Sequence, residues 1–167
     1  PILKEILEEY PNVHFIYIGT GGIRTDDLYA KFVYGGDLFE GLPKNRESML
    51  PVPPEIWPYI LATLQADIAI APLEKNYFNT AKSQCKYLEY GINGIAGVYS
   101  KHHYTDVVEG KTGLLADTPE EWKYQLKRLI ENANLRTKIG ENARKDVIEN
   151  HNLNDHLQVW EDFIKQV

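Results

Sequence analysis

The chain has 167 residues, 43% of them hydrophobic and 25% charged, a composition typical of folded globular proteins and too apolar for a disordered one. Its formal net charge of -6 argues against a general nucleic-acid binder, because neutralising phosphates requires clustered lysine and arginine side chains. The single cysteine, Cys85, excludes an intramolecular disulfide and a CxxC metal pair, so a reducing cytoplasm is the expected compartment.

Hydropathy gives no sign of a membrane span or of a secretion signal. No apolar run approaches the roughly 18 residues of a spanning helix, and no basic segment followed by an apolar one opens the chain. The sequence starts at Pro1 and enters an amphipathic pattern directly. We therefore expect that a preceding segment belongs to the full protein.

The first third of the chain predicts a helix, a strand and an irregular region. Apolar residues at helical spacing predict a surface helix over residues 2–10. Residues 13–18 are β-branched and aromatic, which predicts a buried strand that runs into the glycine-rich loop 19–22. Residues 35–55 mix glycine, proline and charge without a clear period, with room for a short strand at 48–50.

Helices and strands alternate in the middle of the chain. A short helix opened by a proline is expected at residues 58–64, and residues 67–72 predict a central strand covered on both faces. A helix over residues 82–92 follows, and short strands are expected at 95–99 and 113–116. This alternation predicts right-handed crossovers between parallel strands.

The last third of the sequence predicts only helices. Residues 118–121 supply an N-cap threonine, a proline at the first helical position and a capping-box glutamate. Apolar residues continue with four-residue spacing over 135–147, and a further amphipathic helix covers 157–164. Trp122 and Trp160 fall in these amphipathic patterns, so we expect both in the core.

These elements predict an α/β fold, a Rossmann-like three-layer α/β/α arrangement with a mostly parallel sheet and a helical C-terminal segment. We expect one domain over residues 1–167. Ligands of such sheets bind beyond the carboxyl ends of the strands. The loops after Ile18, Ala71 and Tyr99 are therefore the expected place of function.

Residues 78–91, FNTAKSQCKYLEYG, form the most informative segment. On a helix its polar face would carry Lys82, Lys86 and Glu89, and its apolar face would carry Cys85, Leu88 and Ile92. Free amide groups at the start of this helix, near Lys82 and Ser83, would suit an anion. A carboxylate two turns further on, at Glu89, could accept both hydrogen bonds of a ribose diol.

The alternative is a purely structural role for the same side chains. Lys86 and Glu89 would then form an exposed helical ion pair that stabilises the helix by roughly a few tenths of a kcal/mol. Spacing by itself favours this alternative.

The pattern PL(x)nFNxxKSxxKYLEYG, followed later by EGKTGLL, resembles the donor-binding half of GT-B glycosyltransferases, and glycosyltransferase family 4 (glycosyl transferases group 1) fits best. The resemblance covers nearly the whole chain. It implies that Glu89 binds the ribose hydroxyls, that backbone amides at Lys82 and Ser83 hold the diphosphate, and that the sugar lies close by. We also expect lysines of this segment, such as Lys86, to stabilise the diphosphate.

One position departs from the pattern of that family. Many members have a second glutamate eight positions before Glu89 that contacts the donor sugar, whereas this chain has Ala81 there. The resemblance leaves Asn79, Thr80 or Lys82 as substitutes for that contact.

The resemblance also implies an activity, which is sugar transfer from a nucleoside diphosphate sugar to a glycan, a lipid or another acceptor, with retention of configuration. It implies a nucleotide-sugar donor, no tightly bound cofactor and no strict metal requirement. We expect the acceptor-binding half and the first strand of this half to lie outside the chain. The chain alone should then bind donor weakly and transfer nothing, and any peripheral membrane contact would come from the other half.

Two other motifs give weaker signals. Gly21, in the loop after the first strand, could let a backbone approach phosphate, although Arg24 stands where a GxGxxG fingerprint needs glycine. The adjacent His102 and His103 cannot form the i, i+4 pair of helical metal sites, so we assign no metal. We expect a solvated loop there, and the alternative is that the two histidines lie near the donor crevice. A non-catalytic interaction module, or a sugar-nucleotide epimerase or phosphorylase of the same architecture, are the rival functions.

Overall fold

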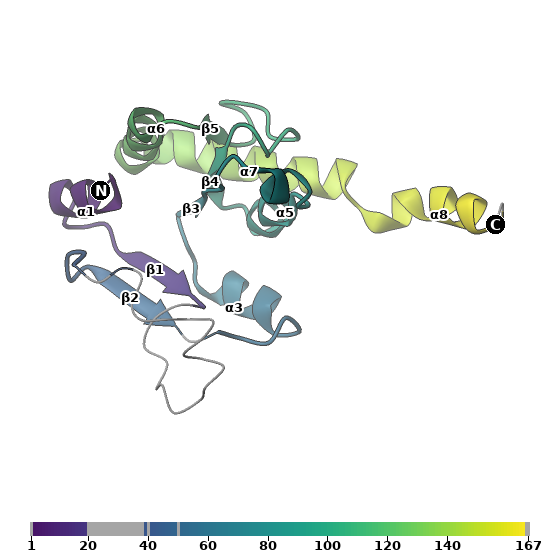
Figure 1. Ribbon diagram of the computed structural model, residues 1–167, viewed down its shortest axis with the longest axis horizontal. Helices are drawn as coiled ribbons and strands as arrows, with labels where there is room; N and C mark the ends of the chain where they lie inside the picture. Colours follow the sequence, from purple (N-terminus) through teal and green to yellow (C-terminus); the bar gives the residue numbers. More distant parts are fainter. Residues whose placement is uncertain (1, 20–38, 40, 50, 166–167) are drawn as a thin grey trace. The chain divides into compact units, whose positions relative to one another are not determined.

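The computed structural model describes residues 2–19, 39, 41–49 and 51–165 (Figure 1). The chain divides into two compact units, Pro1–Leu64 and Gln65–Val167. Strands that the sequence places in one sheet form two parallel sheets, one in each unit. The α/β class, the parallel strand pairing and the helical C-terminal segment are confirmed.

The first unit contains two helices and a two-stranded parallel sheet among its described residues. Its elements are α1 (Ile2–Glu9), β1 (Phe15–Ile18), β2 (Arg46–Met49) and α3 (Trp57–Thr63). The register of the two strands runs from Phe15 opposite Arg46 to Ile18 opposite Met49. The predicted helix and strand at the start of the chain are thus confirmed, and the region expected to be irregular contains β2. Gly21 lies outside the described residues.

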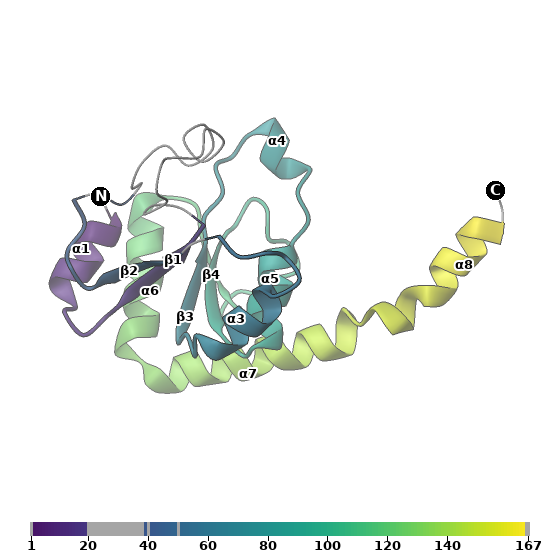
Figure 2. The same ribbon diagram turned by 90° about the horizontal axis from the view of Figure 1, so that it is seen from below.

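The second unit holds a three-stranded parallel sheet in the order β3-β4-β5. Its elements are β3 (Ile68–Ala71), α4 (Tyr77–Thr80), α5 (Cys85–Ile92), β4 (Ala96–Ser100), β5 (Leu114–Ala116), α6 (Pro119–Glu131), α7 (Ala133–Asn150), a 3-10 turn (Leu153–His156) and α8 (Leu157–Lys165). Within this unit, α5 and α6 lie on opposite sides of the strands (Figure 2), and α7 contacts both helices. Because the strands are parallel, their carboxyl ends share one edge, called the carboxyl edge below.

The core of the second unit is built around aromatic residues of β4 and α5. Tyr87 and Tyr99 are fully buried, with ring centroids 5.8 Å apart in an edge-to-face arrangement. Small residues let α7 approach closely, since a Cβ at Gly140 would lie 2.0 Å from the carbonyl oxygen of Gly94. Similarly, a Cβ at Gly91 would lie 2.7 Å from a methyl group of Val147. This packing holds α5 against both β4 and α7.

The C-terminal helices confirm one local prediction and contradict another. Thr118 accepts a hydrogen bond from the amide of Glu121, whose carboxylate accepts one from the amide of Thr118, so the predicted capping box opens α6. Trp160, expected in the core, is 60% exposed in α8, a helix that buries none of its residues. The amphipathic pattern of α8 was correct, but no described part of the chain covers its apolar face.

Candidate functional site

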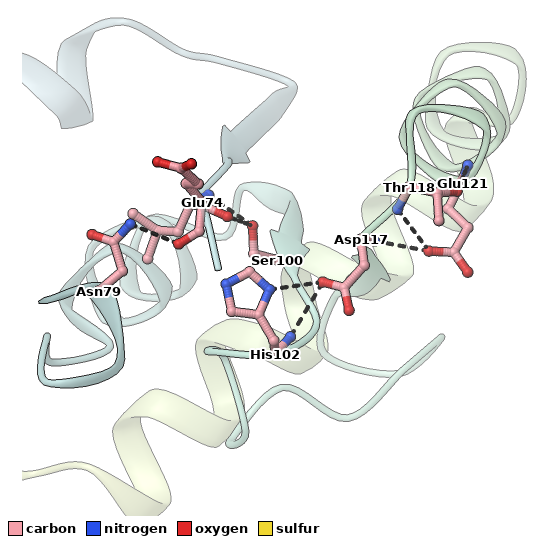
Figure 3. Close-up of polar contacts among 8 residues, drawn as sticks. Glu74, Asn79, Ser100, His102, Asp117, Thr118 and Glu121 are labelled. Atoms are coloured by element: carbon pink, nitrogen blue, oxygen red, sulfur yellow. Dashed lines mark hydrogen bonds and ion pairs between the residues drawn. The ribbon is translucent and has the colours of Figure 1, made fainter. Parts of the chain in front are cut away.

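The loop after β3 is fixed to β4 by a serine side chain. The hydroxyl of Ser100 accepts a hydrogen bond from the amide of Leu73 (2.7 Å) and donates to the Leu73 carbonyl (3.1 Å), as drawn in Figure 3. Ser100 is the last residue of β4 and is itself buried. The loop after β3 is therefore held to the end of β4 by two hydrogen bonds.

Asn79 organises the short helix α4 that follows. Its side-chain nitrogen donates to the Glu74 carbonyl (2.7 Å), and its amide donates to the side chain of Asn76 (2.8 Å), which caps the helix. Asn79 is buried, whereas Thr80 is exposed and its hydroxyl donates to the Tyr77 carbonyl. The side chain of Asn79 thus holds the loop in place, which accounts for its burial without a ligand.

The helix that carries Glu89 starts later than the sequence predicted. It begins at Cys85 rather than Lys82, because α4 forms as a separate turn and the amide of Lys82 donates to the Asn79 carbonyl (3.2 Å). Lys82 and Ser83 lie in the exposed link between the two helices. The backbone amides that lack an intrahelical acceptor therefore belong to the first turn of α5, which starts at Cys85.

The faces of α5 also differ from the prediction. Tyr87 and Gly91 are its buried residues, while Cys85 and Ile92, assigned to the apolar face, are exposed. The reason is that Gly91 packs against α7 and Tyr87 packs against β4. The buried face of α5 is therefore rotated by about one residue from the predicted face.

Lys86 and Glu89 share the outer face of α5 and pair with each other. Lys86 Nζ lies 2.7 Å from Glu89 Oε2, and the two side chains remain 46% and 29% exposed. Burial, with a smaller contribution from the negative charge of Glu89, raises the pKa of the neighbouring Tyr90 to about 12. The ion pair of the structural alternative is thus present, and the side chain of Glu89 is partly exposed.

Lys82 and Ser83 make local contacts of their own. Lys82 Nζ lies 4.9 Å from the centroid of the exposed Phe78 ring. The hydroxyl of Ser83 lies 3.0 Å from the sulfur of Cys85. Both residues are exposed beside the first turn of α5, so their side chains are accessible where a diphosphate is predicted to bind.

The loop after β4 is tied to the link before α5. The side chain of Gln84 donates to the Thr105 hydroxyl (3.2 Å) and accepts from the amide of Asp106 (3.0 Å). His103, which is buried, places its Nε2 3.4 Å from the carbonyl oxygen of Ser83. These contacts bring the predicted residues near Ser83 together with the loop that follows β4.

His102 and His103 are not in a solvated loop as predicted. His102 Nδ1 lies 2.9 Å from Asp117 Oδ1, and the backbone amide of His102 donates to the same oxygen (3.3 Å; Figure 3). Although partial desolvation acts in the opposite direction, the hydrogen bonds from His102 hold the pKa of Asp117 below its usual range. Asp117 comes 15 residues later in the chain, so spacing gave no signal for this pair.

Two kinds of feature are absent from the part of the chain that is described, a cluster of metal-ligating side chains and a membrane-spanning helix. No three histidine, cysteine, aspartate or glutamate side chains there come together in a way that could hold a metal ion. None of the described helices has the length and apolar character needed to cross a bilayer.

Comparison with known proteins identifies the fold. No protein-family model and no curated protein sequence matches the chain. Among solved structures, the C-terminal domain of LpcC, a glycosyl transferase group 1 family protein from Francisella tularensis, superposes with a TM-score of 0.65 at 19% identity, covering 90% of this chain and 75% of that one. TarM superposes with a TM-score of 0.66 at 17% identity, covering 96% of this chain but only 30% of TarM.

The chain therefore has the Rossmann-like fold of a GT-B C-terminal domain, as the resemblance implied. It spans less than a third of the length of TarM.

Proposed function

We propose that the chain is the donor-binding domain of a glycosyltransferase that moves a sugar from a nucleoside diphosphate sugar to a glycan, a lipid or another acceptor. The observation that carries the proposal is the position of Glu89 on α5, partly exposed and charged, in a domain with the fold of a glycosyl transferase C-terminal domain. Since one fold hosts many functions, the fold by itself would not be enough, and the residues of α5 supply the chemistry.

Glu89 is the proposed ribose-binding residue. A carboxylate only accepts hydrogen bonds and has two oxygens, so it matches a pair of adjacent hydroxyl groups. Lys86 Nζ lies 2.7 Å from Oε2, which holds the carboxylate in one orientation and leaves its second oxygen for a ligand. In this proposal the ion pair orients the ribose-binding group.

The diphosphate would lie at the first turn of α5. Helix N-termini attract anions because their first amide groups lack intrahelical acceptors and carry partial positive charge. The exposed side chains of Lys82 and Ser83 precede this turn, and Lys86 lies within it, so two lysines and one hydroxyl are close to the same amides. Donor charge would be neutralised locally, which is needed in a chain with a net charge of -6.

Sugar transfer itself would require a second domain that closes over the donor. The chain covers 30% of TarM, so the sugar transfer that we propose would be the activity of a longer protein that contains this domain. We propose transfer with retention of configuration, and we expect the 167-residue chain to bind nucleotide without turnover.

The test is a calorimetric titration of the chain with UDP and GDP, comparing the unchanged protein with Glu89→Gln. Loss of charge-assisted hydrogen bonds to a diol is expected to weaken nucleotide binding by about 10- to 100-fold. Glu149→Gln is the matched control, because Glu149 also pairs with a lysine on a helix of the same unit, at 3.9 Å from Lys145. Equal affinities for all three proteins would show that Glu89 does not contribute to nucleotide binding.

Failure of the unchanged protein to bind either nucleotide would contradict the proposal as a whole and favour a non-catalytic interaction module. Ala81, where many glycosyltransferases of the resembling family carry a sugar-binding glutamate, is the feature that favours this second candidate.

A further inference from the structure

One ring nitrogen of His102 is hydrogen-bonded, and the other has no hydrogen-bond partner among the described residues. Its Nδ1 and its backbone amide both bond Asp117 Oδ1, which fixes the ring between the loops after β4 and β5. The side chain is 11% exposed, and Nε2 is buried without a hydrogen-bond partner among the described residues. A buried polar atom without a partner is costly to the folded state and is rare in proteins, so this nitrogen needs an explanation.

The contact with Asp117 determines what the second nitrogen can bind. The hydrogen bonds from His102 favour the ionised form of the Asp117 carboxylate, which can only accept, so Nδ1 must carry the proton of the pair. In the neutral ring, Nε2 then has a lone pair and requires a hydrogen-bond donor. Sugar hydroxyl groups can donate to it, whereas the oxygens of an ionised diphosphate cannot.

His102 also lies at the correct edge of the sheet. The amide of Lys101, its chain neighbour, donates to the Ala116 carbonyl at the end of β5, and His103 on its other side reaches the Ser83 carbonyl before α5. In Figure 3 the second ring nitrogen of His102 points away from Asp117. The ring therefore lies in the same group of loops that would bind the donor.

We propose that His102 is a specificity-determining residue of the donor site, with Nε2 accepting a hydrogen bond from a hydroxyl group of the transferred sugar and Asp117 fixing the tautomer. This inference rests on the proposed function and extends it to the sugar.

A structural role is the alternative, in which His102 only joins two loops. His102→Asn separates the two roles, because the asparagine side-chain nitrogen can still donate to Asp117 while the acceptor at Nε2 is removed. Asp117→Asn is the second variant, since an amide in that place can donate to Nδ1 and reverse the tautomer. His14→Asn is the control, because His14 is about half exposed in the first unit and pairs with Glu47.

The experiment measures dissociation constants of the 167-residue chain for UDP, GDP, UDP-glucose and GDP-mannose. With the nucleotide that the unchanged protein prefers, we expect His102→Asn and Asp117→Asn to weaken binding of the sugar nucleotide about threefold to tenfold and to leave binding of the bare diphosphate unchanged. Equal effects on both ligands, or no effect on either, would overturn the inference while the proposed function stands. Absence of nucleotide binding by the unchanged protein would overturn both.

Nitrogen-15 spectra of the imidazole groups give a readout that a structural role would not change. We expect His102 to be the Nδ1–H tautomer, and its Nε2 resonance to move on addition of the sugar nucleotide but not of the bare diphosphate. A protonated Nε2 in the neutral ring, or the same resonance shift with both ligands, would overturn the assignment even if one of the variants failed to fold.

Discussion

Two buried tyrosines of the second unit allow a matched pair of substitutions with opposite expected effects. Tyr87 and Tyr99 are both fully buried and contact each other edge to face. The hydroxyl of Tyr87 donates to Asp146 Oδ2, whereas the hydroxyl of Tyr99 has no partner among the described residues. Replacing each with phenylalanine removes the same atom from two different environments.

The expected magnitudes follow from these partners. Tyr87→Phe removes a charge-assisted hydrogen bond and should lower the free energy of unfolding by about 1.5–3 kcal/mol. Tyr99→Phe removes an unpaired buried hydroxyl, whose burial costs about 1–3 kcal/mol, and should raise the free energy of unfolding by a similar amount. Burial also raises the pKa of Tyr99 well above its ordinary value, in keeping with a hydroxyl that is shielded from water.

The assay is urea unfolding followed by circular dichroism, with the slopes compared to confirm that both variants expose similar surface. The two variants should differ by at least about 2.5 kcal/mol, or roughly 5 °C or more in melting temperature for a chain of this size. If Tyr99→Phe destabilised the protein as much as Tyr87→Phe, the Tyr99 hydroxyl would have a partner and the reasoning would be refuted.

Two further predictions concern packing and pH. Gly140→Ala should lower the free energy of unfolding by about 1–3 kcal/mol despite the better helix propensity of alanine, because the added Cβ would lie 2.0 Å from the Gly94 carbonyl oxygen. Glu141→Ala is the control at an exposed position of the same helix, and a stabilised Gly140→Ala variant would contradict the close approach. Burial raises the pKa of Tyr90 to about 12, so the unfolded chain loses this proton first. The contribution of Tyr90 to stability should be constant below about pH 10 and then be lost at about 1.4 kcal/mol per pH unit up to about pH 12, and Tyr99, whose pKa burial also raises, adds to this loss. Unfolding curves at pH 9 and 11 check this, and equal stabilities would contradict it.

Elements specified by neighbouring residues were predictable from the sequence. The capping box at Thr118 and Glu121 involves groups only three residues apart, so the residue pattern places the start of α6 correctly. The strands also lie within one or two residues of their predicted bounds, because β-branched and aromatic runs that pack on a sheet are visible locally. The parallel pairing followed from the alternation of strands and helices.

The predicted start of α5 was wrong for a local reason that the spacing of apolar residues did not reveal. Asn76 caps a separate turn, α4, and that turn uses the amide of Lys82, so the helix carrying Glu89 restarts at Cys85. Which face of α5 is buried depended on α7, since Gly91 packs against Val147 far along the chain. Helical periodicity defines a face only to within about one residue when polar and apolar positions alternate closely.

By itself, the sequence determined the α/β class, the capped helices, the parallel strand pairing and the position of Lys86 and Glu89 on one helix. Only the tertiary structure decided that His102 is buried against Asp117 and that Trp160 lies exposed on α8. The physical reason is that helix caps, strand propensity and side-chain periodicity depend on residues a few positions apart. Burial and polar pairing depend instead on which distant segments meet, and no local pattern encodes that.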